Sequence, residues 1–112
     1  MNAQDLRKEA QSLRDKAQAM RRDAESHAQK AAGKSSNQDY AGAQMENDQS
    51  QKMSEQATQL EQQAIQKDEE ATKLEQQAEA LRQRGQQLQS EMTTINSQIE
   101  QLLGPSSFGG RF

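Results

Sequence analysis

The chain has 112 residues, of which 30% are hydrophobic and 3% aromatic, and its formal net charge is −3. A globular domain usually holds about 45–50% apolar residues, so this composition argues against a rounded hydrophobic core. The absence of cysteine excludes disulfides, thiolate metal sites and cysteine nucleophiles.

No apolar run follows Met1, and no stretch approaches the ~20 apolar residues that a membrane span requires. We therefore expect no signal peptide and a cytoplasmic protein, while non-classical secretion stays open. Residues 1–34 carry eight basic and five acidic side chains, whereas residues 35–112 carry six and twelve. A basic first part and an acidic second part favour pairing with each other over binding to nucleic acid.

Residues 1–32 repeat every seven positions, which predicts a first coiled-coil helix. One row of this repeat is alanine throughout: Ala3, Ala10, Ala17, Ala24 and Ala31. The other row is mostly large: Leu6, Leu13, Met20 and His27. Asn2 is the expected N-cap, with Asp5 three residues later.

Residues 33–51 interrupt the repeat and are expected to form a polar turn or linker, part of which can be helical. Gly33 and Gly42 bound a stretch rich in Ser and Asn, which is typical of a turn. The heptads on its two sides are out of phase, because Met45 continues the first register and Met53 starts the second. The sequence leaves open whether this segment turns or continues a helix.

Residues 52–103 form the longer second coiled-coil helix of the prediction, with seven heptads in one register. Its large row is interrupted once by lysine: Met53, Leu60, Lys67, Leu74, Leu81, Leu88, Ile95 and Leu102. Its second row changes from small to large: Ala57, Ala64, Ala71, Ala78, Gly85, Met92 and Ile99. Gly104 and Pro105 are expected to end this helix.

The two helices predict an all-α fold, an antiparallel helical hairpin coiled coil with an alanine-rich seam and a longer second helix, which we expect to be oligomeric. Antiparallel pairing sets alanine against a large side chain in nearly every layer, which keeps the packing density even. Facing residues whose numbers add up to 84 illustrate this, as in Leu13 with Ala71. A register one heptad away, with a sum of 77, stays open.

The second helix is expected to extend beyond the first, which leaves part of its large row without a partner in the same chain. An exposed apolar row usually marks an interaction site. We therefore expect a homo-oligomer, a dimer or higher, in which the interface residues are Leu81, Leu88, Met92, Ile95, Ile99 and Leu102.

Residues 104–112 form a tail rich in Gly and Ser that contains both phenylalanines of the chain, Phe108 and Phe112. Aromatic side chains on an unstructured segment can anchor a docking peptide, so another protein can bind here. An unstructured end without a partner explains the same composition.

Three features resemble chemical sites without the context that such sites require. Residues 28–35 fit a relaxed phosphate-binding loop, but a heptad helix precedes them instead of a strand. His27 is the only histidine and lies in the large row, where a tolerated seam residue is the simpler interpretation. Lys67 interrupts the second large row and is expected to penalise misaligned pairing.

These observations predict a protein without enzymatic activity, cofactor or metal, and argue against nucleic-acid and membrane binding. The leading interpretation is a structural or assembly protein that self-associates through the C-terminal part of its long helix. The alternative is a small helical adaptor or chaperone that binds a protein partner through the same apolar row and the tail. The sequence indicates neither the biological process nor the partner.

Overall fold

The computed structural model describes residues 1–104, which form two α-helices and no strand. Helix α1 spans Ala3–Ser36 and helix α2 spans Tyr40–Leu103. The predicted all-α class is therefore confirmed for this part of the chain. The tail with Phe108 and Phe112 lies outside the described residues. The chain divides into a first unit, Met1–Leu74, and a second unit, Glu75–Phe112.

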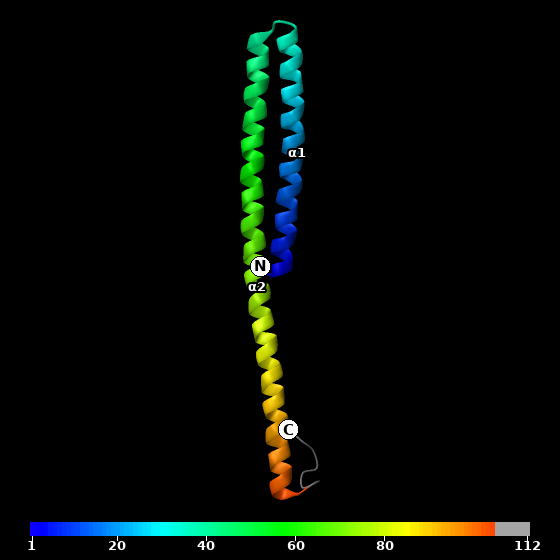
Figure 1. The fold of residues 1–112 in the computed structure, drawn as a ribbon, viewed down its shortest axis with the longest axis vertical. Helices are drawn as coiled ribbons and strands as arrows, with labels where there is room; N and C mark the ends of the chain where they lie inside the picture. Colours follow the sequence, from blue (N-terminus) through cyan, green and yellow to red (C-terminus); the bar gives the residue numbers. More distant parts are fainter. Residues whose placement is uncertain (105–112) are drawn as a thin grey trace. The chain divides into compact units, whose positions relative to one another are not determined.

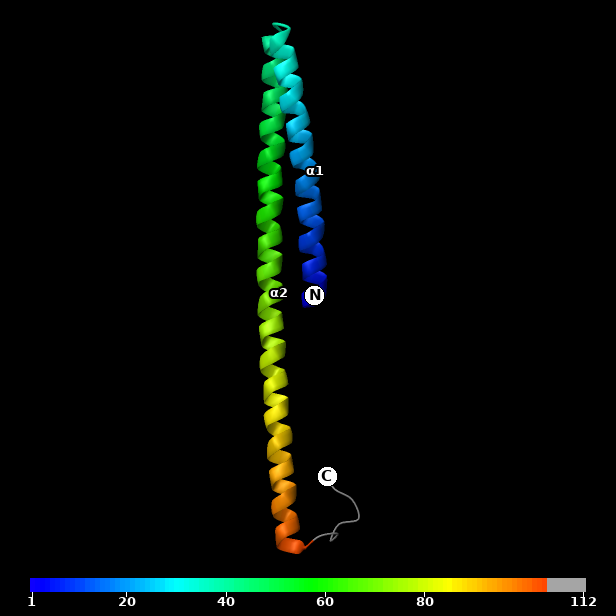
Figure 2. The same cartoon turned by 45° about the vertical axis from the view of Figure 1, so that its right-hand side comes forward.

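The first unit is a helical hairpin, in which α1 and residues 40–74 of α2 lie side by side and run in opposite directions (Figures 1 and 2). Asn2 caps α1 as predicted, because its Oδ1 accepts the N–H of Asp5 at 2.9 Å. The Asp5 carboxylate accepts the N–H of Asn2 in return at 3.4 Å, which completes a capping box.

The turn of the hairpin consists of residues 37–39, so the interruption is much shorter than the expected segment 33–51. Helix α1 continues through Gly33, and Asn37 donates its N–H to the carbonyls of Gly33 and Lys34 at 3.2 Å. Gln38 takes up a left-handed conformation with φ of 64°, which reverses the chain. Asp39 then starts α2, since its carboxylate accepts the N–H of Gly42 at 3.0 Å.

The core of the hairpin is made almost entirely of alanine. Nine residues are buried in the described part of the chain, and eight of them are alanine: Leu6, Ala10, Ala17, Ala24, Ala31, Ala43, Ala57, Ala64 and Ala71. The hydroxyl of Ser50 in α2 donates a hydrogen bond to the backbone carbonyl of Ala24 in α1 at 2.7 Å. A side chain as short as serine reaches the opposite backbone, so the small residues bring the two helices close together.

The structure corrects the pairing register from a sum of 84 to a sum of 77. A turn centred on Gln38 places residues opposite each other when their numbers add up to about 76–77. Burial agrees, because Ala71 is fully buried and is thus placed against Leu6, whereas Ala78 is exposed. The register with a sum of 84 fails because it would place the turn at residue 42, which lies inside α2.

Ion pairs between the two helices flank the alanine core. Asp68 of α2 accepts hydrogen bonds from Arg7 at 3.1 Å and from Arg14 at 2.6 Å. The hydrogen bond from Arg14, followed by the one from Arg7, holds the pKa of the Asp68 carboxyl below its usual range. Arg21 pairs with Glu61 in the same way and lowers the pKa of that carboxyl. The basic first helix thus pairs with the acidic second one, although exposed pairs each contribute only ~0–1 kcal/mol.

In the second unit, the described residues form the last part of α2 and its end. Gly104 has a φ of 86° and donates its N–H to the carbonyl of Glu100 at 2.7 Å. This conformation suits glycine, which confirms Gly104 as the residue that ends the helix. Neither of the described helices holds a stretch that is apolar and long enough to span a lipid bilayer.

Candidate interaction surface

A row of large apolar side chains follows one side of α2 in the second unit. We call it the apolar row, and it consists of Leu81, Leu88, Met92, Ile95, Ile99 and Leu102. Five of the six are exposed, from 47% for Met92 to 84% for Leu102, while Ile99 is half-buried. The six predicted interface residues are therefore brought together on one helix face by their spacing of three and four residues.

In the hairpin, the same heptad positions of α2 are covered by α1, and the apolar row has no such cover among the described residues. Leu60 and Leu74 hold equivalent positions in α2 and are half-buried, because α1 packs against them. Leu81 is one heptad further along and is 70% exposed. No described residue covers the apolar row as α1 covers these leucines, and exposed rows of this kind are typical of interaction sites.

Leu103 enlarges this surface and was not among the predicted interface residues. It is 58% exposed and follows Leu102 directly, at the position that flanks the row. The sequence signal for Leu103 was that it is a large apolar residue directly beside the two heptad rows. Gly85 holds a heptad position between Leu81 and Leu88, and a Cβ atom added to it would meet nothing within 4 Å.

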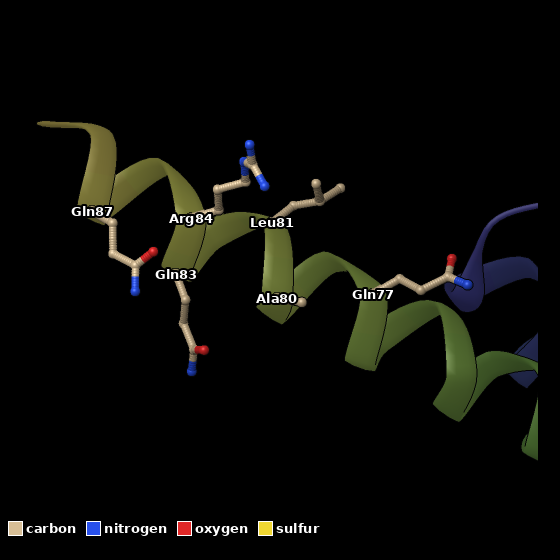
Figure 3. Close-up of a pocket in the computed structure, with 6 residues that line it drawn as sticks. All are labelled: Gln77, Ala80, Leu81, Gln83, Arg84 and Gln87. Atoms are coloured by element: carbon tan, nitrogen blue, oxygen red, sulfur yellow. The ribbon is translucent and has the colours of Figure 1, made fainter.

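A shallow hollow beside the apolar row is lined by Gln77, Ala80, Leu81, Gln83, Arg84 and Gln87. Figure 3 shows that Leu81 and Arg84 point to one side of the helix, whereas Gln83 and Gln87 point to the opposite side. Side chains that diverge from one helix cannot surround a small molecule, because a ligand site needs convergent groups in a concave pocket. The hollow therefore does not enclose a small-molecule site.

The hairpin has a second distinctive cluster, which lies near the turn and is polar. Glu46 of α2 lies 2.5 Å from Nδ1 of His27 and accepts a hydrogen bond from Nζ of Lys34 at 3.2 Å. The hydrogen bond with His27, followed by that with Lys34, holds the pKa of the Glu46 carboxyl below its usual range. His27 is half-buried between the helices, where it was predicted as a seam residue.

Two residues of this end of the seam, Glu46 and Ser50, were missed in the sequence. The signal was present, because the two rows that contain Met53 and Ala57 reach Glu46 and Ser50 when they are continued one heptad towards the N-terminus. Both residues are polar, so the apolar heptad pattern ends before it reaches them. The cluster is a structural contact between helices, and its three side chains all belong to the hairpin.

The phosphate-loop-like segment and Lys67, which the sequence analysis also named, belong to the helices of the hairpin. Residues 28–35 lie inside α1, so their N–H groups belong to a helix and do not form a phosphate-binding loop. Lys67 is half-buried in the seam and pairs with Glu9 of α1 at 3.3 Å. Within residues 1–104, no three His, Cys, Asp or Glu side chains are grouped so that they could hold a metal ion.

Comparison of the chain with protein-family models, with curated proteins and with solved structures finds no match in any of the three.

Proposed function

We propose that this chain is a non-enzymatic structural or assembly protein, a coiled coil that self-associates through residues 81–103. The observation that carries the proposal is the exposure of the apolar row. In the hairpin, large side chains face alanines of the other helix. Beyond Leu74, the large side chains continue in the same heptad positions, while the first helix has ended.

The energy available at the apolar row supports self-association. Transfer of one leucine, isoleucine or methionine from water to an apolar interface contributes about 1.5–3 kcal/mol. A symmetric dimer buries the row of each copy, so twelve such side chains leave water. This gain has to exceed the cost of immobilising two chains, which is about 4–15 kcal/mol. The row is therefore long enough to hold a dimer together.

Light scattering coupled to size-exclusion chromatography tests the proposal on the full chain. We expect a defined oligomer for the unmodified protein and a monomer for the double variant Ile95→Ser and Ile99→Ser. Two substitutions on each copy remove four isoleucines from a dimer, which costs at least about 6 kcal/mol and weakens association by about 10⁴-fold. The control is Gln87→Ser with Gln101→Ser, which introduces the same residue type on an exposed helix face away from the row.

A monomeric unmodified protein at high micromolar concentration would contradict self-association. A monomer that forms a complex only when an unfolded protein is added would instead support the adaptor or chaperone interpretation, which uses the same row. An oligomer that the double isoleucine variant leaves intact would show that another surface holds the copies together. The three results are distinguishable in one series of chromatograms.

A further inference from the structure

We infer that the partner of the apolar row is the same segment of a second copy, packed antiparallel so that the numbers of facing residues add up to 180. This inference rests on the proposed self-association and adds its direction and register. The facing pairs are Ala78 with Leu102, Leu81 with Ile99, Gly85 with Ile95, and Leu88 with Met92. Each pair occurs twice, so the arrangement is a closed twofold dimer centred on residue 90.

Side-chain size is the first argument for this arrangement. Gly85 lies inside a helix, where glycine costs about 0.5–1 kcal/mol relative to alanine. A Cβ at Gly85 would meet no atom within 4 Å, so its own chain does not require a glycine there. Parallel pairing in register would set Gly85 against Gly85 and leave a void between two leucine layers, which lowers packing density. Antiparallel pairing places the side chain of Ile95 over it.

The antiparallel arrangement produces two further kinds of layer, one with a small side chain facing a large one and one with large side chains on both sides. Ala78 against Leu102 repeats the combination found in the hairpin, where small side chains of one helix face large ones of the other. The pairs of Leu81 with Ile99 and of Leu88 with Met92 are large on both sides. They bury the most apolar surface and supply most of the free energy of association.

The length of the segment is the second argument. Helix α1 starts at Ala3, which the register of the hairpin sets against Leu74, and α2 ends at Leu103. Both heptad rows continue in one register from residue 74 to residue 78. The heptad positions that α1 covers up to Leu74 are therefore the same positions that are exposed from Ala78 onward. A second copy whose Leu102 faces Ala78 covers the open rows from Ala78 onward and leaves Leu74 to Ala3 of the hairpin.

The antiparallel register one heptad further along does not fit that length. An antiparallel copy moved one heptad further would set Leu102 against Ala71, which Leu6 already covers in the hairpin register. The sum of 180 is the longest overlap that leaves both hairpins intact.

Disulfide trapping tests the direction and the register, and the cysteine-free sequence makes it clean. We would prepare Leu81→Cys and Ile99→Cys as full chains, one of them with an N-terminal tag that separates it on a gel. The mixture is equilibrated in a glutathione buffer and run without reductant. We expect a mixed disulfide between the two variants in about tenfold excess over either like pair, because only the mixed thiols are held at a high effective concentration.

The like pairs are the built-in control. In the antiparallel dimer of the Leu81→Cys variant, the two introduced sulfur atoms are about 27 Å apart along the helix axis, since 18 residues separate position 81 from position 99. Gln87→Cys, on an exposed face away from the row, sets the background of random collisions. Like pairs that form as readily as the mixed disulfide, or more readily, would overturn the antiparallel arrangement.

A second measurement keeps the result independent of cysteine chemistry. At a sum of 180, Glu91 of one copy lies beside Glu91 of the other, close to the twofold axis, and like charges there oppose association. Glu91→Gln is therefore expected to tighten self-association about two-fold, with an effect that shrinks at high salt. An unchanged dissociation constant would contradict the register. If the unmodified chain is a monomer throughout, the proposed function fails together with this inference, whereas like-pair disulfides in an oligomer refute only the inference.

Discussion

Two alanines of α2 lie in nearly identical sequence and in opposite environments, which makes them a sharp test of the hairpin register. Ala64 and Ala78 each follow the same four residues, Leu-Glu-Gln-Gln. Ala64 is 1% exposed, and the register with a sum of 77 sets it against Leu13, whereas Ala78 is exposed. We predict that Ala64→Leu destabilises the hairpin by about 1–3 kcal/mol, the usual cost of overpacking a filled core.

The matched variant, Ala78→Leu, should change the free energy of unfolding by less than about 0.5 kcal/mol, because leucine and alanine have similar helix propensities. Circular dichroism at 222 nm during thermal unfolding, at a concentration low enough to keep the chain monomeric, measures both variants. Each kcal/mol shifts the melting temperature of a domain of this size by about 4–8 °C. Equal losses at the two positions would refute the register with a sum of 77, because the alternative register buries both alanines.

Two further predictions concern the turn end of the hairpin. The pKa of Glu46 is lowered chiefly by the hydrogen bond with His27, so the stabilising contribution of this carboxylate is present above the usual value of 4.5 and is lost as the pH falls below it. Glu46→Gln should therefore reduce the loss of stability that urea titrations measure between pH 7 and pH 3. An undiminished loss would contradict the role of this carboxylate. Gly33→Ala should stabilise α1 by about 0.5–1 kcal/mol, because the added methyl group meets open space inside a helix. In Gly42→Ala the same methyl group collides with the capping carboxylate of Asp39, so this variant should give no gain. Equal increases in melting temperature for the two variants would refute this account of the cap.

The apolar and alanine rows made the two helices and their packing predictable, because a heptad repeat fixes which side chains share a face. Leu6, Ala10 and Ala17 are buried as their positions required. The apolar row could be found for the same reason, since its six members were identified by spacing alone. What it binds could not be read from spacing, because a free apolar face accepts any partner of suitable shape.

The turn was harder to locate, because the residues that make it are not the ones that usually signal a turn. Gly33 is a common helix terminator, yet it lies within α1. Gln38 adopts the left-handed conformation that glycine or asparagine would adopt at lower cost. The capping role of Asp39 was the local signal for the start of α2, and the pairing register followed from it. Without this boundary, two registers one heptad apart satisfied the same alanine and leucine rows.

The alanine core of the hairpin also has a thermodynamic consequence. An alanine exposes little apolar surface when it leaves the core, so unfolding of this unit should change the heat capacity less than unfolding of a globular domain of the same length. A small heat-capacity change flattens the dependence of stability on temperature, so the hairpin should resist cold denaturation. The large side chains of the apolar row would add a larger heat-capacity change once they are buried between copies.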